Sequence, residues 1–228
     1  EAMLGESIGG IVAYPAGDHV GELQQGESYT IHPQTPEGER PLRVLCVGNM
    51  SKRKGFHTVL AALAKVPQTA VHVHFVGSQS DRAYMRMLAD QITRFGLSER
   101  VTFWGALPDP ELYERYQNAD LLVVPSYEGF GIVYLEAMHF GLPVIGSTAG
   151  AAHEIVTHGT NGFLIDLHDS EGLASHLVAL HNDRKLLNQM STAARNHFKR
   201  HPTWEASMGR IYDWLTHWHK NQTGKTAQ

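Results

Sequence analysis

Two carboxylates flank a glycine-rich turn near the middle of the chain. Glu128 is followed by Gly-Phe-Gly, and Glu136 comes eight residues after Glu128. Such a turn leaves backbone N–H groups free at the start of the next helix, where they and the helix dipole favour an anion. Carboxylates accept hydrogen bonds from pairs of hydroxyls. A ligand with hydroxyls at both ends and phosphates in between, such as a nucleotide sugar, fits this layout.

A run of cations lies on an earlier loop. Lys52, Arg53 and Lys54 follow an apolar segment that ends at Gly48. Cations at the start of a helix predict a second phosphate site, although a solvated basic turn explains this loop equally well on its own. The loop is not a P-loop, because the Gly-x4-Gly-Lys-Ser/Thr spacing is absent, and it has no Gly-x-Gly-x-x-Gly fingerprint of a dinucleotide fold.

The two glutamates also suggest a glycosidase, in which one carboxyl group is the acid and the other the nucleophile. If most of the span between Glu128 and Glu136 is helical, they lie about 12 Å apart. That is wider than the roughly 5–5.5 Å of retaining glycosidases or the roughly 6.5–9.5 Å of inverting ones. The structural alternative is a helix N-terminal acid and a solvent-facing acid, and it suits Glu136 less well because its neighbours are apolar.

The elements that would position these residues begin at Pro41. Short apolar runs read as strands buried on both faces, which is typical of parallel sheets; they cover 43–48, 71–77, 101–105, 120–125, 143–146 and 162–165. Apolar spacing and caps predict helices over 58–66, 82–95, 109–116, 131–140, 150–157, 170–182, 184–199 and 203–219. This alternation predicts an α/β fold with a doubly wound, Rossmann-like parallel sheet. Ligands bind beyond the carboxyl ends of such strands, where both motifs lie.

The chain divides into three parts. Residues 1–40 are rich in Gly, Pro, Gln and Glu and predict an irregular linker with one short strand at 11–14. Residues 41–202 form the Rossmann-like domain, and residues 203–228 form a C-terminal helix and tail. That helix is rich in aromatic residues, for which core packing is the default and exposure, favouring self-association, is the alternative. The rings are Trp204, Tyr212, Trp214 and Trp218.

Composition excludes several classes of protein. The chain has 228 residues, 42% of them apolar, which is enough for a sizeable core. Nineteen Lys and Arg against 23 Asp and Glu argue against nucleic acid or an anionic membrane as the main partner. No stretch approaches the roughly 20 apolar residues of a membrane-spanning helix. Fifteen histidines lack His-Glu-x-x-His spacing, so no metal site is predicted. The lone Cys46 predicts a buried thiol in a reducing compartment.

Together the motifs resemble the C-terminal, donor-binding half of a family-4 retaining glycosyltransferase (glycosyl transferases group 1) with the GT-B fold. Residues 128–136 resemble the family's Glu-x7-Glu motif, and 137–145 resemble the segment after it. Residues 150–156 resemble Gly-Gly-x-x-Glu-x-Val, with Ala151 at the second Gly. Arg53-Lys54-Gly55 resembles the Lys-Gly after the first strand, and Tyr14-Pro-Ala-Gly-Asp resembles the interdomain segment.

The resemblance implies catalytic roles for three residues. Lys54 would neutralise the donor diphosphate, with Arg53 as a second cation, and Glu128 would bind the transferred sugar. The implied donor-binding residues are Asn49, Leu107, Asp109, Ser126, Tyr127, Gly129, Phe130, Gly131, Ile132, Val133 and Glu136. Glu136 would hold the ribose hydroxyls, and the loop around Leu107 and Asp109 the base. Asn49 stands where the family has Arg, which removes one cation beside the leaving diphosphate.

The resemblance further implies retaining transfer of a sugar from a nucleoside-diphosphate sugar to an acceptor, with no metal or other cofactor. An N-terminal domain outside this chain would bind the acceptor and could bring a cytoplasmic enzyme to the inner membrane surface. Met3 stands behind two other residues, as expected for a chain cut from a longer protein. The alternatives are a non-catalytic nucleotide-sugar binding module and a GT-B nucleotide-sugar epimerase or phosphorylase. The base, the sugar and the acceptor stay open.

Overall fold

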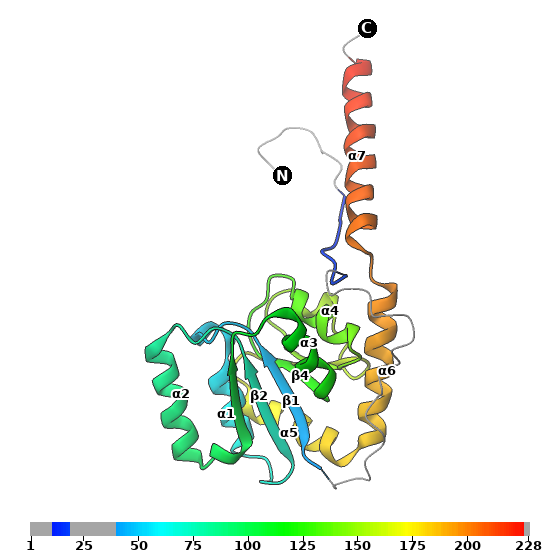
Figure 1. Cartoon of the computed structure of the whole chain (residues 1–228). Coiled ribbons are helices and arrows are strands. Elements are labelled where there is room, and N and C mark those ends of the chain that lie inside the picture. The colour runs from blue at the N-terminus through cyan, green and yellow to red at the C-terminus, as the bar shows by residue number, and fades with distance from the viewer. Residues whose placement is uncertain (1–10, 19–39, 226–228) are drawn as a thin grey trace.

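The computed structural model describes residues 11–18 and 40–225, with side chains up to His219 (Figure 1). Most of the predicted linker and the last three residues of the chain therefore lie outside the described residues. The division into residues 1–40, 41–202 and 203–228 stays a prediction.

In the described ranges, six parallel strands form one sheet in the order β3-β2-β1-β4-β5-β6. The strands are β1 (Leu42–Val47), β2 (Val71–Val76), β3 (Val101–Gly105), β4 (Leu121–Val124), β5 (Val144–Ser147) and β6 (Gly162–Ile165). The chain starts in the middle of the sheet, builds outward to β3, and returns beside β1 to build β4 to β6. This order confirms the predicted doubly wound, Rossmann-like fold.

Helices cover both faces of the sheet (Figure 1). The α-helices are α1 (Phe56–Leu63), α2 (Arg82–Phe95), α3 (Asp109–Asn118), α4 (Ile132–His139), α5 (Ser170–Asn182), α6 (Arg184–Arg200) and α7 (Trp204–Lys225). Short 3-10 turns are η1 (Lys52–Lys54), η2 (Ser98–Arg100) and η3 (Ala152–Glu154). One apolar core joins the sheet to α1, α2 and α5, and the other joins it to α3 and α4. Both cores include residues of α6.

The central strands are apolar throughout because both of their faces are buried. In β4, Leu121 and Val123 lie in the core beneath α1, while Leu122 and Val124 lie in the core beneath α4. Cys46 of β1 is buried in the first core, where burial raises the pKa of its thiol. The predicted buried thiol is therefore confirmed.

Two predicted elements are wrong. Residues 11–17 form no strand; the carbonyl groups of Tyr14 and Pro15 instead accept hydrogen bonds from side chains of the C-terminal part of the chain. Residues 150–157 form only the short turn η3. Gly150 has a positive φ of 86°, and the N–H of Ala151 bonds to the carbonyl of Glu128 instead of beginning a helix.

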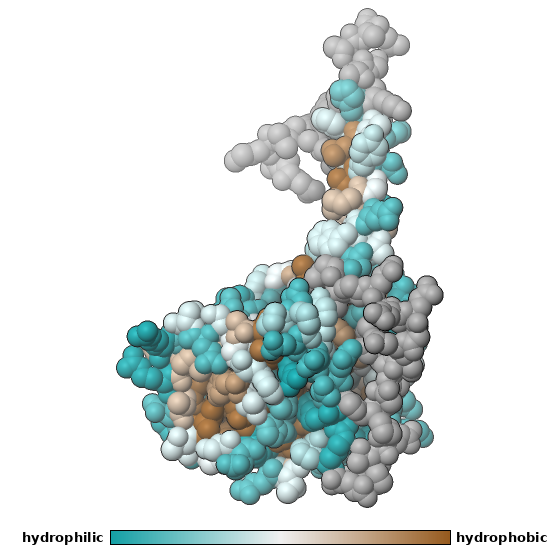
Figure 2. Space-filling model, in the orientation of Figure 1, coloured by the Kyte–Doolittle hydropathy of each residue, from teal (hydrophilic) through white to brown (hydrophobic). Residues whose placement is uncertain are grey.

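Helix α7 projects away from the sheet (Figure 1). Apolar side chains lie on its surface (Figure 2). Trp204, Tyr212 and Trp218 are exposed, with Tyr212 at 70%, while Trp214 stacks on Trp218. Core packing of these rings was the default expectation, and it is wrong. The helix leaves the body of the domain, so the sheet offers these side chains no surface to pack on.

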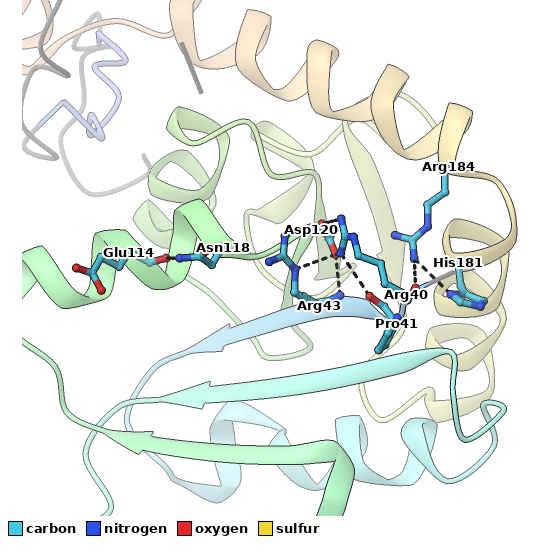
Figure 3. Close-up of polar contacts among 8 residues, drawn as sticks. All are labelled: Arg40, Pro41, Arg43, Glu114, Asn118, Asp120, His181 and Arg184. Atoms are coloured by element: carbon cyan, nitrogen blue, oxygen red, sulfur yellow. Dashed lines mark hydrogen bonds and ion pairs between the residues drawn. The ribbon is translucent and has the colours of Figure 1, made fainter. Parts of the chain in front are cut away.

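Charged residues fix the chain where it enters the sheet (Figure 3). The Asp120 carboxylate, just before β4, accepts hydrogen bonds from both terminal nitrogens of Arg40 at 2.7 and 2.8 Å and from the Arg43 N–H at 2.8 Å. Burial alone would raise the pKa of Asp120, but the bonds and charges of the two arginines outweigh it and lower that pKa. Arg184 donates to the Arg40 carbonyl at 2.8 Å. This network lies at the amino ends of the strands.

Candidate functional site

The residues singled out in the sequence lie at the opposite edge, where the parallel strands have their carboxyl ends. The loops after β1 and β2 run side by side there, because Met50 N–H donates to the Ser78 carbonyl at 2.8 Å. The backbones approach so closely that a Cβ on Gly77 would come within 2.0 Å of the Gly48 oxygen. The predicted location of the site at this edge therefore agrees with the observed topology.

The loops after β1 and β4 meet through an ion pair. Lys54 Nζ lies 2.6 Å from Glu128 Oε1, and Ser126 Oγ donates to the same oxygen at 2.5 Å. The Lys54 and Glu128 side chains are only 16% and 13% exposed, and Ser126 is fully buried. A cation and a carboxylate are thus held together at a partly desolvated position, where their interactions with a polar ligand are stronger than in water.

Glycine places Lys54 at this position. Gly55 has a φ of 73°, which ends η1 and begins α1. A Cβ on Gly55 would lie 2.8 Å from the Pro125 carbonyl oxygen at the end of β4. Only glycine accepts both this backbone conformation and this approach without strain, so the residue after Lys54 lets its loop close against the loop that carries Glu128.

Arg53 lies at the rim of the same site. Its side chain is 63% exposed, and it donates to the Tyr127 carbonyl at 3.1 Å and lies 4.0 Å from Glu128 Oε1. The Tyr127 side chain is exposed, and so is Asn49 on the loop after β1. The structure therefore brings Lys54, Arg53 and Glu128 together, and the catalytic roles implied for them stay predictions.

The turn after Glu128 leads directly into α4. Gly131 has a φ of 88° and is followed by the first helical residue, Ile132. A Cβ on Gly131 would lie 2.4 Å from the buried ring of Tyr134, so a larger residue is excluded there. No side chain caps this helix in the described structure, which leaves the N–H groups of Ile132 and Val133 available to an anion. Glu128 itself precedes the helix, so only the part of the span from Ile132 to Glu136 is helical.

The loop after β5 holds the Glu128 backbone from the other side. Ala151 N–H donates to the Glu128 carbonyl at 3.0 Å, and a Cβ on Gly150 would lie 2.2 Å from that oxygen. Ala151 itself has an ordinary φ of −96°. Gly150 is therefore required where it stands, and Ala151 is readily accepted in place of a second glycine.

Glu136 is held by a residue that the sequence analysis missed. The hydroxyl of Tyr116 in α3 donates to Glu136 Oε2 at 2.8 Å. Tyr116 is buried, and burial together with the Glu136 charge raises the pKa of its hydroxyl well above the usual value, so it stays a donor. Periodicity marked Tyr116 only as the end of a predicted helix, and nothing in the sequence showed which residue it would face across the fold.

Leu107 and Asp109 lie on a separate loop after β3. Leu107 is partly buried against the core beneath α4, and Asp109 is the exposed first residue of α3. This places both residues at the same edge of the sheet as the Lys54–Glu128 pair. Their predicted contact with a base stays a prediction.

Among residues 11–18 and 40–225, no three His, Cys, Asp or Glu side chains form a group that could hold a metal ion. His72 and His74 do share one face of β2, with ring centroids 4.8 Å apart. None of the helices in these ranges has the length and apolar character needed to cross a bilayer.

Comparison with known proteins identifies the family to which this fold and site belong. The family model described as Glycosyl transferases group 1 matches residues 28–197. The chain belongs to this family. The resemblance inferred from the sequence motifs is therefore confirmed at the level of the family.

Two named relatives agree with this assignment to the family. The chain is 34% identical over 182 residues to a D-inositol 3-phosphate glycosyltransferase of Thermobispora bispora, covering 76% of this chain and 42% of the relative. It is 30% identical over 188 residues to a GDP-mannose-dependent alpha-(1-6)-phosphatidylinositol monomannoside mannosyltransferase of Mycobacterium tuberculosis, covering 78% of this chain and 48% of the relative.

Among solved structures, Anabaena HepE in complex with UDP-glucose is 30% identical with a TM-score of 0.70, covering 78% of this chain and 50% of that protein. The sheet and helices thus match one Rossmann-like half of a GT-B glycosyltransferase. The chain spans about half the length of the curated relatives it matches.

Proposed function

We propose that this chain is the donor-binding part of a retaining glycosyltransferase, which transfers a sugar from a nucleoside-diphosphate sugar to an acceptor. The observation that carries the proposal is the contact between Lys54 and Glu128 beside the uncapped start of α4. One site then offers a cation, a carboxylate and free N–H groups, which suit a phosphate and a hydroxyl-bearing sugar side by side.

Each charged residue takes one part of the donor. Lys54 binds the diphosphate together with the N–H groups of Ile132 and Val133, and Arg53 adds a second cation at the rim. Glu128 accepts hydrogen bonds from hydroxyls of the sugar. Glu136, held by Tyr116, accepts those of the ribose. The remaining predicted donor-binding residues line the path between these groups, with Asn49 near Lys54 and with Leu107 and Asp109 toward the base.

The transfer step breaks the bond between the anomeric carbon and the diphosphate oxygen. The electron pair leaves with the diphosphate, whose growing negative charge Lys54 and the α4 N-terminus stabilise. The acceptor hydroxyl then forms the new bond on the same face of the sugar, and its proton passes to the departing diphosphate oxygen. These residues carry the phosphate charge without a metal ion, and a cytoplasmic enzyme with no metal cofactor remains our prediction.

The acceptor is proposed to bind a partner domain. The relatives are about twice the matched length, which is compatible with such a domain. The exposed apolar side chains of α7, among them Trp204, Met208 and Leu215, offer it a surface to pack on. Because one relative is named as GDP-mannose-dependent and the solved neighbour contains UDP-glucose, either base fits the proposal.

Calorimetric titration of the chain with UDP, GDP and ADP tests the donor site. We expect one nucleotide to bind, and Lys54→Met to weaken its binding about 10- to 100-fold, which corresponds to about 1.4–2.8 kcal/mol. Lys65→Met is the matched control, because Lys65 also pairs with a glutamate, Glu171, but follows the C-terminal end of α1, the opposite end from Lys54. Binding of none of the three nucleotides to the wild-type chain would contradict the proposal.

Retention is tested separately. The chain is incubated at high concentration with the nucleoside-diphosphate sugar that binds, and proton NMR follows the anomer first released by slow hydrolysis. Retention predicts the same anomeric configuration as in the donor. First release of the opposite anomer would refute retention while leaving donor binding intact.

A further inference from the structure

Three aromatic rings from distant parts of the chain meet beside the donor-binding turn. The ring centroids of Tyr14 and Phe130 lie 6.2 Å apart, those of Tyr14 and His201 6.1 Å, and those of Phe130 and His201 6.1 Å. Each ring thus touches both others at distances where aromatic pairs attract. Phe130 belongs to the turn between Glu128 and α4, whereas Tyr14 precedes β1 and His201 follows the last residue of α6.

The segment around Tyr14 is fixed by more than its ring. Ala16 is buried, and Gly17 packs so tightly on α4 that a Cβ there would lie 2.7 Å from the Cβ of Leu135. His201 Nε2 donates to the Pro15 carbonyl at 2.8 Å, and Ser207 Oγ donates to the Tyr14 carbonyl at 2.7 Å. The segment 14–17 therefore touches the Glu-x7-Glu motif at two places, its turn and its helix.

The same segment is tied to the base of α7. The Asp18 carboxylate accepts from the Trp204 N–H at 3.2 and 3.3 Å, which caps the first turn of that helix. Figure 1 shows residues 11–18 running between the base of α7 and the body of the domain beside α4. Through these contacts, residues 14–18 are bound to the junction between α6 and α7. The same residues pack on the Glu-x7-Glu motif through Phe130 and Leu135.

Within residues 129–131, Phe130 supplies the one side chain that can hold the turn. Phe130 stands between two glycines, and a Cβ on Gly129 would meet no atom within 4 Å. Glycine has more backbone freedom than any other residue and so costs the most entropy to fix. The Phe130 ring is partly buried, and it is the largest side chain by which residues 129–131 can be anchored to the rest of the chain.

We infer that Tyr14 and His201 are positioning residues for the donor site: they hold the Phe130 ring and thereby fix the backbone N–H groups that receive the donor's diphosphate. This inference rests on the proposed function for the ligand, but the contacts it uses are independent of Lys54 and Glu128. It also links the donor turn to two other segments, residues 14–18 before β1 and residues 201–207 after α6.

The test compares Tyr14→Ala with Tyr14→Phe in the full chain. The ring makes the contacts to Phe130 and His201, so the phenylalanine variant keeps them. Affinities for a nucleoside diphosphate and its monophosphate are measured with the base that binds the wild type. The ratio is the affinity for the diphosphate divided by the affinity for the monophosphate. We expect Tyr14→Ala to lower this ratio about tenfold, because the terminal phosphate loses its aligned N–H groups. Tyr14→Phe should restore the ratio.

Two further variants make the comparison specific. Gly17→Ala is expected to lower the ratio in the same direction, because its Cβ would push the segment off Leu135. Tyr212→Ala, which removes an exposed ring on α7, should leave the ratio unchanged. A Tyr14→Ala chain with a lower melting temperature but an unchanged ratio would show a merely structural role and overturn the inference.

Hydrogen–deuterium exchange of the unliganded chain gives a readout that needs no nucleotide. Under the inference, Tyr14→Ala speeds amide exchange at residues 129–133 more than in the strands of the sheet, and Tyr14→Phe does not. Unchanged exchange at residues 129–133 would overturn the inference even if the chain binds nucleotide. If the wild type binds no nucleotide, the proposed function fails, and this exchange measurement still decides whether Tyr14 positions the turn.

Discussion

Lys54 Nζ lies 2.6 Å from Glu128 Oε1, so the cation proposed for the diphosphate is paired with the carboxylate proposed for the sugar. Both side chains are largely shielded from water. A donor must therefore either displace this pair or bind across it. Breaking a shielded ion pair leaves a charge that needs a new partner. The phosphate and the sugar hydroxyls would supply one for each residue.

Glu128→Gln tests this competition. The substitution removes the charge that holds Lys54 and that repels a diphosphate, so the affinity for a nucleoside diphosphate should rise about 3- to 10-fold, or about 0.6–1.4 kcal/mol. Any extra affinity contributed by the sugar of the intact donor should fall. Calorimetric titrations with both ligands measure the two effects, and Glu171→Gln, which removes the partner of Lys65, is the control. A loss of diphosphate affinity as large as in Lys54→Met would refute the assigned roles.

Tyr116→Phe removes the hydrogen bond that holds Glu136. Replacing the nucleotide by its 2′-deoxy form should weaken binding to the wild type, because Glu136 loses a hydroxyl partner. In Glu136→Gln this penalty should largely disappear, and in Tyr116→Phe it should shrink. Tyr84→Phe, which removes a buried hydroxyl bonded to His57 and not to Glu136, serves as the control. An equal penalty in all four proteins would show that Glu136 does not bind the ribose.

Gly150→Ala should disturb the backbone of Glu128. A left-handed conformation costs an L-residue about 1–2 kcal/mol, and the added Cβ would also collide with the Glu128 carbonyl. We expect a loss of at least this size in the free energy of unfolding, measured by urea denaturation, together with weaker nucleotide binding. Ala151→Gly, at a residue with ordinary backbone angles, should change unfolding by less than about 1 kcal/mol. Nucleotide affinity unchanged by Gly150→Ala would contradict the account of this loop.

The stability of the chain should fall in mild acid. Burial, with the charges of His72, Arg115 and Arg43, lowers the pKa of His74 from its ordinary 6.5 to about 4. Between these two values the unfolded chain binds a proton that the folded chain does not, so the free energy of unfolding decreases as the pH drops from about 6.5 to about 4. His74→Gln keeps an acceptor for Trp104 Nε1 and should make this decrease smaller. Urea denaturation at pH 7.5 and 5 measures it, and an identical decrease in the variant would count against this role for His74.

The strands of the sheet and the edge that carries the predicted site residues were predictable from sequence because their signals are local. Runs such as 121–124 are apolar at every position, which only a strand buried on both faces explains. The glycines beside Lys54 and Glu128 mark turns where the backbone must adopt conformations closed to other residues. The family motif then placed Lys54 and Glu128 in one site, and the structure shows them in contact.

The features that the sequence did not predict depend on contacts between parts of the chain that are far apart in sequence. Nothing near Tyr116 shows that its hydroxyl reaches Glu136, twenty residues away, because the pairing of α3 with α4 decides it. The segment at 11–14 has the composition of a strand, yet its carbonyls bond to His201 and Ser207 of the C-terminal part. Exposure of the α7 rings likewise depends on where that helix points, not on its sequence.

The most direct measurement of the central claim is a crystal structure of the chain with the bound nucleoside diphosphate. We expect the diphosphate to lie between Lys54 and the N–H groups at the start of α4, with the Lys54 ammonium turned from Glu128 toward phosphate. Glu136 should then accept from the ribose hydroxyls while keeping its bond from Tyr116. A nucleotide bound elsewhere, with the pair of Lys54 and Glu128 intact, would contradict the account.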